Sequence, residues 1–427
     1  MRVAYIAAGA AGMYCGSCIH DNTLATALLR QGVDITLLPT YTPLRTDEAD
    51  ISIDRVFYGG INVYLQQKSS VFSRLPRPLS WLLDRPGLLQ GLSRLNASTD
   101  ARDLGELTVS VLAGEEGRQA RQLEQLAAWL KTEFRPDLVH LTNSMFVGLG
   151  RRLKAELGVP VLCGVQGEDL FLDDLVEPYK DRARQLLHER AADIDAFVAP
   201  NRYYADHMAE YIGLPDERMH VVPLGMVPLE PAPVQAPDDV CTIGYLARIC
   251  PEKGFHLLVD AFRLVAEELG PERVRLKAAG YLGAKDKAYF EQQQSRLARW
   301  GLAERFEYAG EVDRAGKFEF LRGLHLFSVP TVYREAKGLS VLEALACGVP
   351  VVQPGHGAFT EMVEQTGGGA LFEPESAPAL AQTLLDLWRD APQRAALGES
   401  ARTRVAQRFT AEAAAGKLLG VFERYAG

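Results

Sequence analysis

The chain has 427 residues, more than one hydrophobic core usually serves, so two or three domains are expected. Its formal net charge of −9 at pH 7 disfavours a nucleic-acid partner. No stretch approaches the roughly 20 apolar residues that cross a bilayer, and the first apolar run is too short for a signal peptide. We therefore expect a cytoplasmic protein whose six scattered cysteines are reduced thiols.

The first half of the chain alternates apolar runs with amphipathic segments. The amphipathic segments predict helices, the first over residues 21–32 with Asp21 or Asn22 as its N-cap. Continuously apolar runs are typical of parallel strands that are covered on both faces. Such runs occupy residues 2–8, 34–40, 136–142, 160–166 and 195–200. The pattern predicts an α/β domain with an open, doubly wound parallel sheet.

The alternation stops at a proline-rich stretch and then resumes. Residues 229–239 carry no periodic apolar pattern and are predicted to be a linker. Beyond it, helices are predicted over 251–269, 287–300 and 338–348, with a helical tail from about Ala379. Strands are predicted over 240–247, 274–281, 306–312, 324–331 and 350–355. Two doubly wound domains are thus expected, facing a central cleft at the carboxyl ends of both sheets.

Residues 68–96 depart from this alternation. They combine Phe72, Trp81 and several leucines with five basic residues and a single acid, Asp84. One interpretation is a helical excursion packed on its own domain. The other is a surface that contacts a membrane or an amphiphilic acceptor, because basic amphipathic segments bind there.

The stretch GAAGMYCGSCIHDN, residues 9–22, follows the first predicted strand and admits four interpretations. A redox dithiol is disfavoured because the motif opens a long doubly wound domain. Zinc is disfavoured because Cys15, Cys18 and His20 supply at most three of about four ligands. A dinucleotide site is disfavoured because the glycine spacing is wrong and no acid ends the second predicted strand. The fourth interpretation remains: the stretch is a loop of small residues that lets a substrate approach the backbone.

The segment GYLARICPEKG, residues 244–254, carries two cations beside a glycine turn. Gly244 is predicted to end a strand, and Arg248 and Lys253 follow it. A diphosphate leaving a sugar gains negative charge, which two fixed cations would stabilise without a metal. The alternative is a pair of solvated cations on an ordinary loop.

A second constellation lies in YREAKGLSVLEALACGVPVV, residues 333–352. With a helix beginning near Gly338, Glu335 lies in the preceding loop and Glu343 in the second turn, within the apolar stripe. The N–H groups of Lys337, Gly338 and Leu339 are then available to hydroxyls or phosphate. A buried acid such as Glu343 needs partners, and a ribose diol would provide them. The later Gly355, Gly357 and Glu361 are assigned equally to ligand contact or to turn chemistry.

These segments, in this order and spacing, resemble glycosyltransferase family 4, the retaining nucleotide-sugar enzymes of GT-B fold with two Rossmann-like domains. The resemblance also covers VPLGMV, PDLVHLT, GVQGEDLF and the terminal QRFTAEAAAGKLLGVFERY. It implies an acceptor-binding domain over 1–228, a nucleotide-sugar-binding domain over 240–408, and a C-terminal helix over 409–427 that crosses back to the first domain.

The resemblance also implies roles for individual residues. Arg248, Lys253 and Glu335 are the catalytic candidates, and the donor-binding candidates are Gly244, Lys337, Gly338, Leu339 and Glu343. The acceptor-side candidates are Gly12, Cys15, Gly16, Gln166, Glu168 and Asp169. The chain departs from the family at Gln166, where many relatives have histidine, in the MYCGSC loop, and at His325.

The implied reaction moves a sugar from a nucleotide-diphosphate sugar to a glycolipid, polysaccharide or small glycoside, without a metal or another cofactor. A nucleotide-sugar epimerase or hydrolase of the same architecture is one alternative, and a non-catalytic nucleotide-sugar sensor is another. The nucleobase, which would meet backbone near residues 310–312, the sugar and the acceptor are not specified by these residues.

Overall fold

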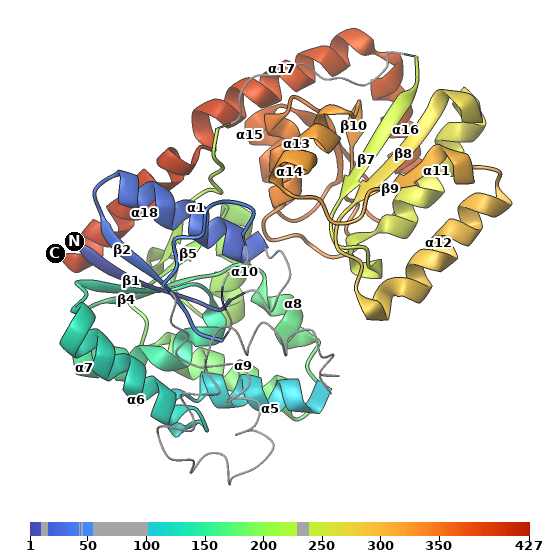
Figure 1. Cartoon of the computed structure of the whole chain (residues 1–427). Helices are drawn as coiled ribbons and strands as arrows, with labels where there is room; N and C mark the ends of the chain where they lie inside the picture. The colour runs from blue at the N-terminus through green and yellow to red at the C-terminus, as the bar shows by residue number, and fades with distance from the viewer. Residues whose placement is uncertain (10–15, 42, 44–45, 54–100, 229–238) are drawn as a thin grey trace. The chain divides into compact units, whose positions relative to one another are not determined.

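The computed structural model describes residues 1–9, 16–41, 43, 46–53, 101–228 and 239–427. The chain forms two compact units (Figure 1): unit 1 is Met1–Gly225 with Ala411–Gly427, and unit 2 is Met226–Thr410. The first unit therefore ends three residues before the expected 228, and the last helix belongs to it. Gly12, Cys15, the segment 68–96 and almost all of the linker lie outside the described residues.

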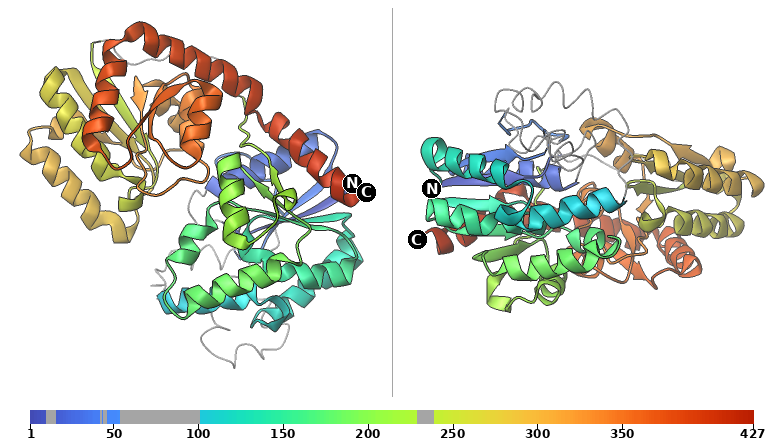
Figure 2. Two further views of the ribbon diagram at one scale, coloured as in Figure 1. Left: turned by 180° about the vertical axis from the view of Figure 1, so that it is seen from behind. Right: turned by 90° about the horizontal axis from the view of Figure 1, so that it is seen from below.

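Unit 1 is built on a six-stranded parallel sheet in the order β2-β1-β3-β4-β5-β6. Its strands are nearly all buried, as their continuous apolar sequences require, and Figure 2 shows helices on both faces of the sheet. The strands are β1 (Arg2–Ala7), β2 (Asp34–Pro39), β3 (Leu138–Leu141), β4 (Val161–Gly164), β5 (Ala196–Ala199) and β6 (Met219–Val221). The helices are α1 (Gly16–Arg30), α5 (Ala101–Leu112), α6 (Ala120–Trp129), α7 (Gly150–Leu157), α8 (Glu168–Asp173), α9 (Tyr179–Ala191), α10 (Arg202–Ile212) and α18 (Ala411–Ala426).

Unit 2 repeats the design with a parallel sheet in the order β12-β11-β10-β7-β8-β9. The strands are β7 (Cys241–Leu246), β8 (Val274–Ala279), β9 (Phe306–Tyr308), β10 (Leu326–Phe327), β11 (Val351–Pro354) and β12 (Gly369–Phe372). The helices are α11 (Phe255–Leu269), α12 (Lys287–Arg299), α13 (Arg314–Arg322), α14 (Leu339–Ala346), α15 (Ala358–Thr366), α16 (Ala377–Arg389) and α17 (Ala391–Arg408). Among the described residues, no helix is long and apolar enough to span a membrane.

Each sheet has one point where the strand order reverses. In unit 1 the chain runs from β1 outward to β2 and returns to place β3 on the other side of β1. In unit 2 it runs from β7 to β8 and β9 and returns with β10 beside β7. Ligands of open α/β sheets bind at the carboxyl ends of the strands that flank such a reversal. The loops after β1 and β3, and after β7 and β10, are therefore the places to examine.

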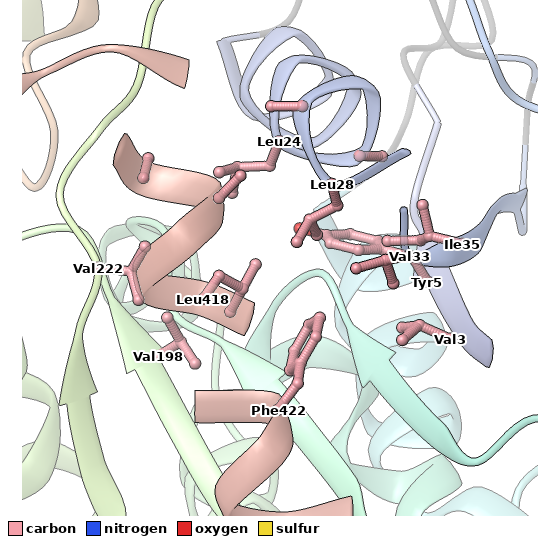
Figure 3. Packing of buried hydrophobic residues seen from close by; sticks show 14 of the residues in the cluster. Val3, Tyr5, Leu24, Leu28, Val33, Ile35, Val198, Val222, Leu418 and Phe422 are labelled. Atoms are coloured by element: carbon pink, nitrogen blue, oxygen red, sulfur yellow. The ribbon is translucent and has the colours of Figure 1, made fainter. Parts of the chain in front are cut away.

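Helix α18 completes the core of unit 1 (Figure 3). Its Leu418 and Phe422 are fully buried in one cluster with Leu24 and Leu28 of α1 and with Tyr5 of β1. Burying a leucine or phenylalanine side chain is worth about 1.5–3 kcal/mol, so the last helix is an integral part of this unit. The chain consequently passes between the units twice, near Met226 and near Thr410, where the two passing segments pair as a parallel bridge.

Three local predictions are wrong. Helix α1 already includes Gly16, so Asp21 and Asn22 lie inside it as buried residues rather than at its N-cap. Gly244 lies within β7, which continues to Leu246. A short 3₁₀ turn over Pro251–Lys253 and a left-handed Gly254 precede α11, so Pro251 does not begin the long helix.

Candidate active site

The reversal in unit 2 brings the two loops with the predicted catalytic residues together. The Nζ atom of Lys253, after β7, lies 2.6 Å from Oε2 of Glu335, after β10. The loops also share backbone contacts, since Val332 N–H donates to the Glu252 carbonyl at 3.1 Å. A Cβ atom on Gly254 would lie 1.7 Å from the Pro330 carbonyl oxygen, so the approach requires glycine.

Glu335 is a buried and ionised carboxylate. Burial would raise its pKa, but the charge of Lys253 and hydrogen bonds from Lys253 and Tyr333 outweigh this and lower the pKa to about 2. Tyr333 donates its hydroxyl to Oε2 at 2.9 Å, and the Lys337 N–H donates to Oε1 at 3.3 Å. The Lys253 ammonium also lies 5.0 Å from the centre of the Tyr333 ring. Lys253, Tyr333 and Glu335 therefore form one charged cluster, with the lysine partly exposed.

Gly357 and Ala358, in the next loop, contact the backbone of Glu335. The Ala358 N–H donates to the Glu335 carbonyl at 2.8 Å. Gly357 has φ 61° and ψ −150°, and a Cβ atom there would lie 2.7 Å from both Glu335 N and Glu335 O. Gly357 thus packs against the Glu335 backbone and supports its position. The sequence had left the role of Gly357 open between ligand contact and turn chemistry.

Glu343 lies on α14, which begins after the left-handed Gly338 as expected. The carboxylate is 6% exposed, and its Oε1 lies 2.5 Å from Nζ of Lys317 on α13. Lys317 is itself 8% exposed, so this is a buried ion pair. Sequence reasoning missed Lys317, although the residue precedes Phe318 on the face of α13 that also carries Leu321, where a buried side chain is expected.

Arg248 occupies the exposed edge of the loop after β7. Its Nε donates to Cys250 Sγ at 3.3 Å, and its carbonyl accepts from the Tyr245 hydroxyl at 2.9 Å. These contacts fix the loop from inside. At Gly244, a Cβ atom would collide with the Leu324 side chain, which gives this glycine a packing role. Roles for Arg248 and Gly244 in donor binding remain predictions.

The other residues singled out in unit 2 have structural partners as well. The Gly310 carbonyl accepts from the Gly280 N–H at 2.8 Å, which fixes the loop where the nucleobase was expected. His325 is buried, and its Nδ1 accepts the Thr242 N–H at 3.2 Å. Its ring lies edge-on to Trp388, with ring centres 5.0 Å apart. His325 therefore belongs to the packing of this unit.

The reversal in unit 1 gathers polar side chains at the ends of β3 and β4. Gln166 is half-buried, and its Nε2 donates to Asp21 Oδ1 at 3.0 Å and to the Thr142 carbonyl at 2.8 Å. The Tyr5 hydroxyl donates to Asp21 Oδ1 at 2.8 Å, and the Thr142 hydroxyl donates to Asp21 Oδ2. Asp21 is 1% exposed. Gly16, another acceptor-side candidate, is the exposed first residue of α1 and takes no part in the hydrogen bonds described above.

Glu168 and Asp169 are buried and bonded within unit 1. Glu168 accepts the backbone N–H groups of Ser144, Gln166 and Gly167 at 3.1, 2.7 and 3.0 Å. Asp169 accepts from the Tyr204 hydroxyl at 2.6 Å and pairs with His207 Nε2 at 2.9 Å. Both acids therefore fix the strand end and α8, while Gln166 carries the more exposed side chain. Their role toward an acceptor stays a prediction.

Comparisons with known proteins agree on one family. Residues 22–225 match the glycosyl transferase 4-like domain, and residues 227–404 match glycosyl transferases group 1. A D-inositol 3-phosphate glycosyltransferase from Stackebrandtia nassauensis is 30% identical over 67% of this chain and 68% of its own length. The chain therefore belongs to glycosyltransferase family 4 and is a glycosyltransferase.

Solved structures show the same fold. Sucrose-phosphate synthase from Thermosynechococcus elongatus aligns with a TM-score of 0.72 at 18% identity, over 99% of this chain and 98% of its own. Anabaena HepE, solved in complex with UDP, aligns with a TM-score of 0.67 at 16% identity, over 99% of this chain and 100% of its own. Two parallel-sheet, Rossmann-like domains of GT-B type were thus correctly predicted.

Proposed function

We propose that the protein is a retaining glycosyltransferase in which unit 2 binds a nucleotide-diphosphate sugar and unit 1 binds the acceptor. The observation that carries this proposal is the Lys253–Glu335 pair, 2.6 Å apart at the strand-order reversal of unit 2. A cation and an ionised carboxylate side by side suit a reaction that separates charge. The leaving diphosphate becomes more negative, and the sugar ring becomes more positive.

The proposed chemistry uses both charges. As the bond between the anomeric carbon and the diphosphate oxygen breaks, Lys253 and Arg248 neutralise the departing oxygens. The Glu335 carboxylate stabilises positive charge on the ring. The acceptor hydroxyl attacks on the face from which the diphosphate leaves, and its proton passes to a phosphate oxygen, so the configuration is retained. No protein nucleophile or metal takes part in this scheme.

The acceptor is proposed to be a small phosphorylated polyol or sugar. This is supported by the names of two similar proteins: the relative from Stackebrandtia is named for inositol 3-phosphate, and the synthase of the same fold is named for a phosphorylated sugar product, sucrose phosphate. Glycolipid and polysaccharide acceptors are the competing classes, and each belongs in the assay as a separate arm.

The test is an assay of nucleotide release. The purified chain is incubated with UDP-glucose, UDP-N-acetylglucosamine or GDP-mannose, each alone and with inositol 3-phosphate, fructose 6-phosphate, phosphatidylinositol vesicles or a soluble polysaccharide. We expect free nucleotide only when an acceptor is present, unchanged rates with EDTA, and a product whose anomeric proton coupling matches that of the donor. Release without an acceptor would instead indicate a hydrolase, and an inverted product would contradict the proposed geometry.

A further inference from the structure

The side chain of Arg248 is held at Nε, whereas its far end has no partner. Nε donates to Cys250 Sγ at 3.3 Å, and the Arg248 carbonyl oxygen accepts from the Tyr245 hydroxyl at 2.9 Å and lies 3.7 Å from the same sulfur. Within the residues that the structure describes, neither Nη atom takes part in a hydrogen bond or an ion pair, and Arg248 is exposed. The two Nη groups therefore form the open end of a planar fork of N–H donors.

The thiol of Cys250 holds this guanidinium without cancelling its charge. Cys250 is fully buried, and burial raises the pKa of its thiol, so the group is uncharged at pH 7. A sulfur atom is also a weak hydrogen-bond acceptor. Burial would lower the pKa of Arg248, but the hydrogen bond to Cys250 and the charges of Glu252 and Asp286 outweigh this and raise the pKa. Among the described residues, no carboxylate forms an ion pair with Arg248, so its charge is available to an anion.

Arg248 and Lys253 consequently differ in how they can meet a diphosphate. The Lys253 ammonium already lies 2.6 Å from Glu335 Oε2, so a phosphate oxygen competes there with a carboxylate. At Arg248 the Nη groups have no such competitor. The fork is thus the part of this loop where two phosphate oxygens can be bound together without breaking an existing ion pair.

The main chain on both sides of Cys250 is anchored. The Ile249 N–H donates to the Tyr281 carbonyl at 2.9 Å, and Pro251 begins the 3₁₀ turn that ends at Lys253. The sulfur atom is therefore a fixed point in the loop. An arginine side chain has many rotamers, and ordering them on binding costs free energy. A contact that orders the side chain beforehand lowers this cost.

We propose that Cys250 is a positioning residue whose neutral thiol holds Arg248 at Nε, so that both Nη groups meet the terminal phosphate of the nucleoside diphosphate as a preformed fork. The inference rests on the proposed transferase function and adds a residue that acts through Arg248 without touching the donor. A nucleoside monophosphate lacks the phosphate that the fork binds. The alignment therefore contributes to the preference for a diphosphate.

Three substitutions separate this role from simple space filling. Cys250→Ala removes the sulfur, and Cys250→Val fills the space but accepts no hydrogen bond. Cys250→Ser keeps an acceptor, because a hydroxyl oxygen can take the Nε–H of Arg248. A purely packing role predicts that serine, which is smaller and more polar than cysteine, behaves worse than valine, whereas the proposed role predicts the opposite order.

Isothermal titration with UDP, GDP and ADP, each beside its monophosphate, measures the effect. The readout is the dissociation constant of the monophosphate divided by that of the diphosphate, for the base that the wild type binds most tightly. In Cys250→Ala and Cys250→Val this ratio should fall about 3- to 10-fold, because Arg248 then has to be ordered on binding. Cys250→Ser should stay within about 2-fold of the wild type.

A double-mutant cycle tests whether the thiol acts through the guanidinium. Arg248→Lys keeps a positive charge but removes the Nε–H group and the fork. Its ratio should be low already, and adding Cys250→Ala should change it by less than about 2-fold. Two independent contributions would instead add in full.

The matched control is Cys241→Ala, the same substitution at a fully buried cysteine at the start of β7, away from the carboxyl end of the strand. It should keep the wild-type ratio. An unchanged ratio in Cys250→Ala and Cys250→Val, an equal loss in Cys250→Ser, an additive double variant or an equal loss in Cys241→Ala would overturn the inference. A wild-type protein that binds none of the three diphosphates would instead overturn the proposed function.

Discussion

Lys253 and Glu335 are 82 residues apart in the chain, yet their charged atoms lie 2.6 Å apart where the strand order of unit 2 reverses. The lysine side chain is 23% exposed and the glutamate side chain 11%, so the lysine is the more exposed partner of the pair. A diphosphate that approaches from solvent would meet the ammonium first. In the proposed scheme, the ion pair would thus present its cation to the donor, with the carboxylate on the more buried side.

Removing the ammonium should stop the reaction. We expect Lys253→Ala to reduce turnover on the order of 10²-fold or more, because stabilisation of charge on the departing diphosphate is lost in the transition state. Steady-state nucleotide release with the best donor and acceptor measures this. Lys287→Ala, an exposed lysine at the start of α12, is the control and should retain full activity. Unchanged turnover in Lys253→Ala would remove this residue from the mechanism.

The buried Lys317–Glu343 pair should matter for both stability and donor binding. Lys317→Met removes one partner of a buried ion pair, which costs about 3–5 kcal/mol. We expect a lower melting temperature and a weaker affinity for the nucleotide diphosphate, because Glu343 is no longer held in place. Differential scanning calorimetry and isothermal titration with UDP and GDP measure the two effects.

A double variant separates these two contributions. Replacing both partners, as in Lys317→Met with Glu343→Leu, should recover much of the melting temperature, since apolar pairs of similar volume often replace buried ion pairs without loss. Nucleotide binding should stay weak if Glu343 holds the ribose. Recovery of binding together with stability would show that the pair is purely structural.

Most of the fold could be predicted because its strands are buried on both faces. Continuously apolar runs such as that of β1 have few alternatives, and the amphipathic pattern of α11 is equally distinct. The elements that were not predicted have weaker patterns. The edge strand β12 is only partly buried and exposes Leu371, and α13 has a lysine on its buried face. Local composition does not reveal which face of such elements meets the core.

The candidate site could be predicted in its parts but not in its pairings. Glu335 and Lys253 stood out as separate motifs, whereas their contact depends on the order of strands in the sheet. Asp21 was interpreted as an N-cap because aspartate favours that position. Its actual partners come from β1 and from loops 121 and 145 residues further along the chain. Lys317 was missed because a lysine on a helix is usually solvated.

A substitution at Gly357 tests whether the packing of this residue against the Glu335 backbone is needed for activity. Alanine at this position would adopt an unfavourable backbone conformation and would press its Cβ against the Glu335 backbone. We expect Gly357→Ala to lose most activity and to cost about 1–3 kcal/mol of stability. Gly355→Ala is the matched control in the same loop, since its Cβ would meet only the Phe372 carbonyl at an ordinary 3.4 Å. Equal behaviour of the two variants would argue against a supporting role for Gly357.

His140 should make unit 1 sensitive to acid. It is buried in β3, with its ring centre 4.6 Å from that of Tyr5 and 5.4 Å from that of Phe422, and burial lowers its pKa to about 3. The unfolded chain binds a proton at this histidine below about pH 6.5, whereas the folded chain does not until about pH 3. The free energy of unfolding should therefore fall as the pH drops through this interval, by about 1.4 kcal/mol per pH unit.

The variant His140→Leu isolates this contribution, because it cannot take up a proton in either state. We expect its unfolding free energy to fall less than that of the wild type between pH 6.5 and pH 5, by roughly 2 kcal/mol. Urea titrations at several pH values, followed by circular dichroism, measure the difference. If His140→Leu kept the wild-type pH dependence, protonation of another group would have to explain the acid sensitivity of unit 1.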